Sequence, residues 1–157
     1  MTASLTDQEE MNLSSGIAAF EAKNFAQSLA LLAPLAENGH ADAQYRLAIM
    51  YQNGLGMVRN ELQAMKWMTA SANQGFPWAQ HGLGFMYMEG DCVAKNGNKA
   101  ITWFTKAAEQ GMAGSQTTLA MMYETGNGVE QDIEEARKWY RLAGFAEDEM
   151  NLGEQLQ

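Results

Sequence analysis

The sequence predicts an all-α fold, an α/α superhelical solenoid of antiparallel helix pairs. Residue types recur every 36 positions, apolar and small residues stand four apart within each unit, and helix-ending and helix-starting residues separate these stripes. Five residue types keep the same register three times, which chance does not produce. They are tryptophan (Trp67, Trp103, Trp139), tyrosine (Tyr51, Tyr87, Tyr123), leucine (Leu47, Leu83, Leu119), glycine (Gly54, Gly90, Gly126) and alanine (Ala64, Ala100, Ala136).

The first helix of each unit is predicted from residues spaced by four. In the first unit these are Ala43, Leu47 and Tyr51, which an α-helix places on one face. Gly54 follows the last turn of this stripe, where a helix end favours a residue that adopts positive φ without strain. The first helix therefore ends before Gly54, and a short loop leads to the second.

The second helix of each unit begins after a capping residue. Asn60, Asn96 and Asp132 stand at the predicted N-cap positions, where their side-chain oxygens accept hydrogen bonds from backbone N–H groups. Small residues and one tryptophan follow on the buried face, as Ala64 and Trp67 do in the first unit. Since one helix pair cannot bury its apolar face alone, neighbouring pairs are expected to stack.

We expect the whole chain, residues 1–157, to form one solenoid domain. A tetratricopeptide-like pair of helices, Met11–Lys23 and Phe25–Glu37, is predicted before the repeats, and an acidic capping helix after them. The predicted parts are the N-terminal pair (5–40), three repeats (41–76, 77–112 and 113–148) and the capping helix (145–157).

Composition and charge narrow the classes of partner. The formal net charge of -9 repels phosphate backbones and anionic membranes, so neither nucleic acid nor a membrane is an expected partner. Cys92, with His40 and His81, supplies too few soft ligands for a disulfide or a zinc site, and no metal or cofactor is expected. The N-terminus has an acidic segment and no apolar run typical of a secretory signal, which predicts a cytoplasmic protein.

The repeated pattern resembles the Sel-1-like repeat family. It reads Ala-x3-Leu-Gly/Ala-x2-Tyr-x2-Gly-x-Gly-Val, followed by an N-cap Asp or Asn and Ala-x2-Trp, and it occurs with minor departures in Ala43–Met57, Ala79–Val93 and Ser115–Val129. The resemblance covers about two thirds of the chain and implies an adaptor, bacterial or eukaryotic, that brings proteins together. Two departures are Cys92 in place of the second loop glycine and Gly97 after the N-cap, which predicts a weaker helix start.

A groove for a protein or peptide ligand is predicted along the first helices of the repeats. Trp78 lies outside the repeated tryptophan set, so the shared core does not account for it. An apolar strip around it favours a binding site, unless a tightly closed superhelix buries these side chains against each other. The predicted partner-binding residues are Tyr45, Ile49, Trp78, His81, Phe85, Met88, Glu89, Thr117, Met121 and Glu124.

The sequence favours a non-catalytic interaction scaffold. No nucleophile stands beside a base in a pattern typical of catalysis, and His81 is interpreted as a polar contact in the groove. Two alternatives stay open. One is the β-lactam binding or hydrolysis described for cysteine-rich relatives, which the lack of paired cysteines disfavours. The other is self-association, as a weak homodimer in place of a monomer, through the solenoid end or the strip at Trp78.

Overall fold

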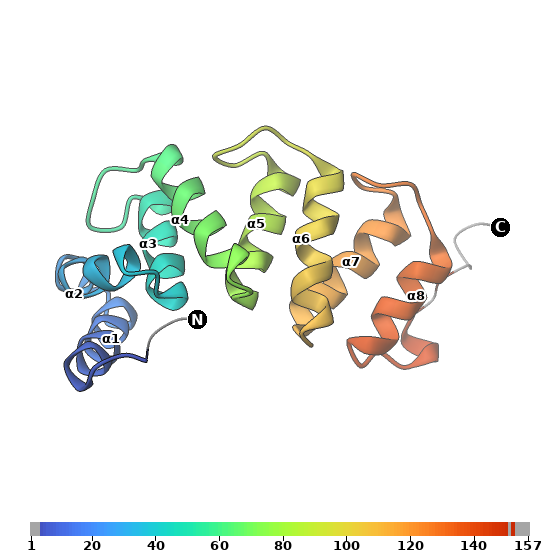
Figure 1. Ribbon diagram of the computed structural model, residues 1–157. Helices are drawn as coiled ribbons and strands as arrows, with labels where there is room; N and C mark the ends of the chain where they lie inside the picture. The colour runs from blue at the N-terminus through green and yellow to red at the C-terminus, as the bar shows by residue number, and fades with distance from the viewer. Residues whose placement is uncertain (1–3, 151, 153–157) are drawn as a thin grey trace. The chain divides into compact units, whose positions relative to one another are not determined.

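The computed structural model describes residues 4–150 and Leu152. Within them the chain forms α-helices and one 3-10 turn without a β-strand, which confirms the all-α class (Figure 1). The elements are α1 (Asp7–Glu21), α2 (Phe25–Glu37), α3 (Ala41–Asn53), α4 (Glu61–Asn73), α5 (Pro77–Glu89), α6 (Gly97–Glu109), α7 (Ala113–Thr125), α8 (Ile133–Leu142) and η1 (Glu147–Glu149). The chain falls into two compact units, unit 1 up to Ala79 and unit 2 from Gln80.

Side-chain caps begin most of these helices. Asn60, Asn96 and Asp132 each accept a hydrogen bond from a backbone N–H three residues later, as the sequence predicts. Helix α1 begins one turn before the predicted Met11, because Thr6 and Glu9 form a reciprocal capping box. The first helices of the outer repeats end in left-handed glycines, Gly54 at φ 65° and Gly126 at φ 71°.

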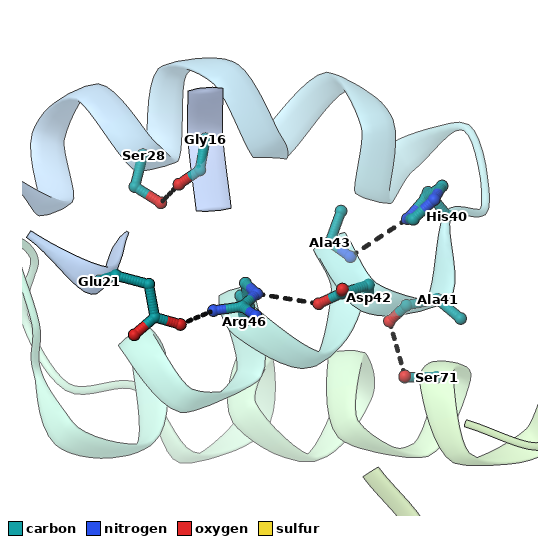
Figure 2. Close-up of polar contacts among 9 residues, drawn as sticks. All are labelled: Gly16, Glu21, Ser28, His40, Ala41, Asp42, Ala43, Arg46 and Ser71. Atoms are coloured by element: carbon teal, nitrogen blue, oxygen red, sulfur yellow. Dashed lines mark hydrogen bonds and ion pairs between the residues drawn. The ribbon is translucent and has the colours of Figure 1, made fainter. Parts of the chain in front are cut away.

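In unit 1, α1 packs on α2, α2 on α3 and α3 on α4. Ser28 Oγ donates to the Gly16 carbonyl at 2.9 Å, and a Cβ at Gly16 would clash with Leu32, so this glycine permits the close approach of α1 and α2. Ser71 Oγ of α4 donates to the Ala41 carbonyl at 2.7 Å, and Figure 2 shows both contacts. Trp67 is buried, as predicted.

In unit 2, Phe104 is the fully buried centre of a cluster that includes Trp139. Gly84 makes room for this ring, since a Cβ there would lie 2.6 Å from it. Trp103 is only partly buried, and the Lys106 ammonium lies 4.6 Å from the Trp103 ring centroid. The prediction that each repeat buries its tryptophan therefore holds fully for Trp139 and only partly for Trp103.

In two repeats a pair of glutamines links the end of the second helix to the first helix of the same repeat. Gln74 Nε2 donates to Gln44 Oε1 at 2.8 Å in unit 1, and Gln110 Nε2 donates to Gln80 Oε1 at 2.8 Å in unit 2. Gln44 Nε2 in turn donates to the Ala36 carbonyl at 3.0 Å. Both pairs occupy equivalent repeat positions, so one polar contact is built twice.

The loop and helix start of the middle repeat differ from those of its neighbours. Cys92 adopts φ 62°, the left-handed conformation that Gly56 and Gly128 adopt at the equivalent positions. A Cβ at Gly97 would overlap the carbonyl oxygen of Gly128, so only glycine lets the two backbones meet. The sequence predicts only an effect of Gly97 on the helix start, and the structure adds a second role, since the residue permits a contact between successive repeats.

The end of the described chain holds the 3-10 turn η1. Residues 145–150, the described start of the predicted capping helix, contain this turn, whereas residues 151 and 153–157 lie outside the described residues. Met150 is buried, and Arg137 donates to the Leu152 carbonyl at 3.4 Å. The side chain of Arg141 pairs with Glu147. These contacts hold the turn against α8.

Candidate functional site

A cleft in unit 1 contains three of the predicted binding residues. Tyr45, Ile49 and Trp78 line a volume of about 500 Å³. The remaining lining residues are Asp42, a groove position of the first repeat, and Phe20, Glu21, Arg46 and Phe76, which the sequence reasoning did not assign to the groove. Helices α1, α3 and the start of α5 therefore meet at one concave surface.

Aromatic rings line the cleft. The rings of Tyr45 and Phe76 are in contact, with centroids 5.4 Å apart and planes tilted by 52°. Trp78 is 57% exposed. It is the second residue of α5, which begins at Pro77. Burial raises the pKa of the Tyr45 phenol.

A charged triad of Glu21, Asp42 and Arg46 also lines the cleft, and Figure 2 shows its contacts. Arg46 Nε donates to Asp42 Oδ1 at 2.9 Å, and Arg46 Nη1 donates to Glu21 Oε1 at 3.1 Å. The guanidinium carbon lies 5.0 Å from the Phe20 ring centroid. The side chain of Arg46 is 16% exposed and that of Glu21 is 68% exposed, so the cation is less accessible than the Glu21 carboxylate.

The other predicted binding residues belong to unit 2. Phe85 and Met121 are exposed, whereas His81 is partly buried between Phe85 and Phe104, with ring centroids 4.8 and 5.6 Å away. The His81 Nδ1 lies 2.6 Å from Ser115 Oγ, and burial lowers the pKa of the imidazole. The His81 ring therefore contacts both an exposed residue, Phe85, and a core residue, Phe104.

The polar residues of the predicted set have different surroundings. Glu124 Oε2 accepts a hydrogen bond from the Tyr140 hydroxyl at 2.7 Å. Burial and this bond raise the pKa of Tyr140. Thr117 Oγ1 donates to the Ala113 carbonyl of its own helix, and Glu89 is exposed at the end of α5. Met88 is partly buried against the core cluster. Glu124 is therefore partly exposed and also makes a hydrogen bond within the fold, to Tyr140.

The cleft residues outside the predicted binding set differ in how clearly the sequence indicates them. Asp42 and Arg46 stand four apart on one helix, a spacing typical of an ion pair. Phe20 and Glu21 lie on α1, whose cleft-facing residues could have been assigned by extending the groove positions into the N-terminal pair. The contact of Glu21 with Arg46 joins two helices and has no local signal.

The described residues contain no cluster of three or more His, Cys, Asp or Glu side chains placed to hold a metal ion. Cys92 is a partly buried free thiol whose Sγ lies 3.6 Å from Asp91 Oδ1. None of the helices that the structure describes is both long and apolar enough to cross a membrane.

Helix pairs repeated with a fixed register define a helical-repeat protein. A family model of the Sel1 repeat matches residues 41–76, 79–112 and 113–144, and the chain belongs to the Sel1 repeat family. This confirms the resemblance inferred from the sequence. Sel1 repeats generally serve as scaffolds for protein–protein interaction and are typically non-catalytic.

Two solved structures support the same fold. A Sel1 repeat protein from Oxalobacter formigenes is 37% identical, with a TM-score of 0.70, over 73% of this chain and 88% of that chain. A protective antigen of uropathogenic Escherichia coli, described as displaying an SLR fold, is 34% identical, with a TM-score of 0.80, over 86% of this chain and 30% of that chain. Comparison with curated proteins gives no significant match.

Proposed function

We propose that this protein is a non-catalytic scaffold that binds a segment of a partner protein, with the cleft at Trp78 as its principal contact. The observation that carries the proposal is the 57% exposure of Trp78 beside the fixed rings of Tyr45 and Phe76. Exposed aromatic side chains in a concave surface are typical anchors of protein interfaces.

The cleft has the size and rigidity that such a contact needs. Its volume of about 500 Å³ lies in the range of pockets that hold a small ligand or a few side chains. The triad of Glu21, Asp42 and Arg46 fixes the positions of α1 and α3 beside the cleft. A preformed surface loses little conformational entropy on binding, which favours affinity.

Unit 2 supplies a second proposed contact region. Phe85 and Met121 are the exposed apolar residues among the predicted binding residues of this unit. The flexible thioether of methionine adapts to differently shaped partners. In this proposal the partner is a protein or peptide, because the net charge of -9 disfavours nucleic acid. The other proposed contact residues of unit 2 are His81, Met88, Glu89, Thr117 and Glu124.

Site-specific photo-crosslinking tests the proposal. A photoreactive phenylalanine analogue replaces Trp78 in one variant and Leu62 in another, and both are irradiated in a lysate of the source organism. Leu62 is 84% exposed on α4 and does not line the cleft, so it is a matched control. We expect a discrete protein adduct from position 78 that is absent from position 62. Equal adducts at both positions, or none at position 78, would contradict the proposal.

A further inference from the structure

We propose that the cleft of unit 1 selects a peptide segment with a bulky apolar side chain next to a lysine or arginine. This inference rests on the proposed function and specifies the chemistry of the partner. It follows from three features of the cleft: its apolar wall, the charge balance of its triad, and the low exposure of its cation.

The apolar wall accounts for the bulky side chain. Tyr45, Phe76 and Trp78 present ring surface to the cleft, and Ile49 adds an aliphatic group. A guest side chain that covers this surface removes apolar area from water on both partners. An aromatic or branched aliphatic residue fills the space better than a small or polar one.

The triad leaves an excess of negative charge. Glu21 and Asp42 share the single guanidinium of Arg46, so the three groups together carry one net negative charge. Each carboxylate uses one oxygen for Arg46, and its other oxygen has no hydrogen bond among the described residues. A guest cation can therefore pair with Glu21 at the cleft edge without breaking the triad.

A guest carboxylate, unlike a guest cation, finds no accessible partner of opposite charge among the residues that line the cleft. Among the residues that line the cleft, Arg46 is the one cation, and it is 16% exposed, bound to two carboxylates and stacked near Phe20. An acidic peptide would have to displace Glu21 or Asp42 and approach a chain with a net charge of -9. Like charges at an interface exclude partners, so the cleft discriminates against acidic segments.

Peptide selection tests this inference directly. A random dodecapeptide display library is panned on the full chain at low ionic strength, and the same library is panned on Trp78→Ser. We expect the sequences enriched on the wild type to carry Lys or Arg within a few positions of Trp, Phe, Leu or Ile. Enrichment of acidic sequences, or of apolar sequences without a basic residue, would overturn the charge preference.

The comparison separates this inference from the function on which it rests. If the wild type enriches nothing beyond Trp78→Ser, the cleft is not a binding site and both proposals fail. If it enriches apolar peptides without regard to charge, the binding function stands and only the charge preference fails.

A synthetic copy of the most enriched dodecapeptide then provides the quantitative probe. Glu21→Gln keeps an oxygen for Arg46 but removes the excess charge, and we expect it to weaken binding about two- to five-fold at low salt. Screening removes most of this difference at high salt. Glu37→Gln makes the same charge change at an exposed residue of α2 outside the cleft and should leave binding unchanged. Equal affinities for Glu21→Gln and the wild type at low salt would overturn the proposal.

Discussion

The core at Trp67 and the cleft at Trp78 both belong to unit 1 and both depend on an indole, but they use it differently. Trp67 is 9% exposed and has counterparts at the same position in the next two repeats. Trp78 is 57% exposed, and the equivalent residues in the neighbouring repeats are Asp42 and Gly114. The recurring tryptophan packs in the core of its repeat, whereas the tryptophan that does not recur lies on the surface and lines the cleft.

The largest expected effect separates the two tryptophans. Trp67→Ala should lower the free energy of unfolding by about 3–5 kcal/mol, because it leaves a cavity between packed helices. Trp78→Ala should cost less than about 1 kcal/mol, because most of its ring is exposed. Urea unfolding followed by circular dichroism measures both. Equal losses would show that Trp78 is a core residue and would remove the basis for the cleft.

Two helical glycines sharpen the comparison at the level of the backbone. Gly97→Ala should destabilise the protein by about 1–3 kcal/mol, because the new Cβ overlaps the Gly128 carbonyl. Gly114 also lies in a first helical turn, but a Cβ there has ordinary contacts with His81, so Gly114→Ala should stabilise by about 0.5–1 kcal/mol. Thermal unfolding of both variants gives the signs. Stabilisation by Gly97→Ala would mean that the repeats do not need this close approach.

Substitutions of Cys92 test whether a non-glycine residue in the left-handed conformation of this loop lowers the stability of the protein. Cys92→Gly should stabilise by up to about 1 kcal/mol, because it relieves a left-handed conformation that its counterparts Gly56 and Gly128 adopt easily. The greater freedom of glycine in the unfolded chain offsets part of this gain. Cys92→Ala is the control, since it removes the thiol but keeps the strained Cβ. If both variants are equally stable, the conformation of Cys92 costs nothing measurable.

His81 predicts the smallest effect, a dependence on pH. Burial lowers its pKa from 6.5 in the fold, so folding favours the neutral ring. Its stabilisation is complete above pH 6.5 and is lost as the pH falls through the lowered pKa. In urea unfolding at pH 7.5 and 5.5, wild type should therefore lose more stability on acidification than His81→Gln. All other groups are the same in both proteins, so their contributions to the difference cancel. Parallel losses would contradict the assignment.

Features that repeat could be predicted from the sequence. The N-caps at Asn60, Asn96 and Asp132 and the left-handed glycines are local, because each is specified by residues within one or two turns. The position of Trp78 on a surface also follows from its absence from the repeated set. The predicted binding residues themselves, like the single-domain organisation, stay predictions.

Contacts between distant segments could not be predicted. The ion pair between Glu21 and Arg46 joins residues on two helices, and the residue spacing within either helix does not predict it. The overlap that makes Gly97 necessary involves a loop of the next repeat. Trp103 shows the same limit, since it is only partly buried at a repeat position where Trp67 and Trp139 are buried. Local pattern fixes helices, and packing between them decides which neighbours meet.

The glutamine pairs restrict how such a chain changes in length. Gln44 reaches Gln74, and Gln80 reaches Gln110, across the same number of residues. Inserting or deleting a few residues between the partners would separate the amides and leave the buried oxygen of Gln44 or Gln80 without its donor. A whole repeat added or removed at a turn brings its own donor and acceptor. Evolution and protein engineers can therefore extend or shorten this array in complete repeats without breaking the amide contacts of the repeats that remain.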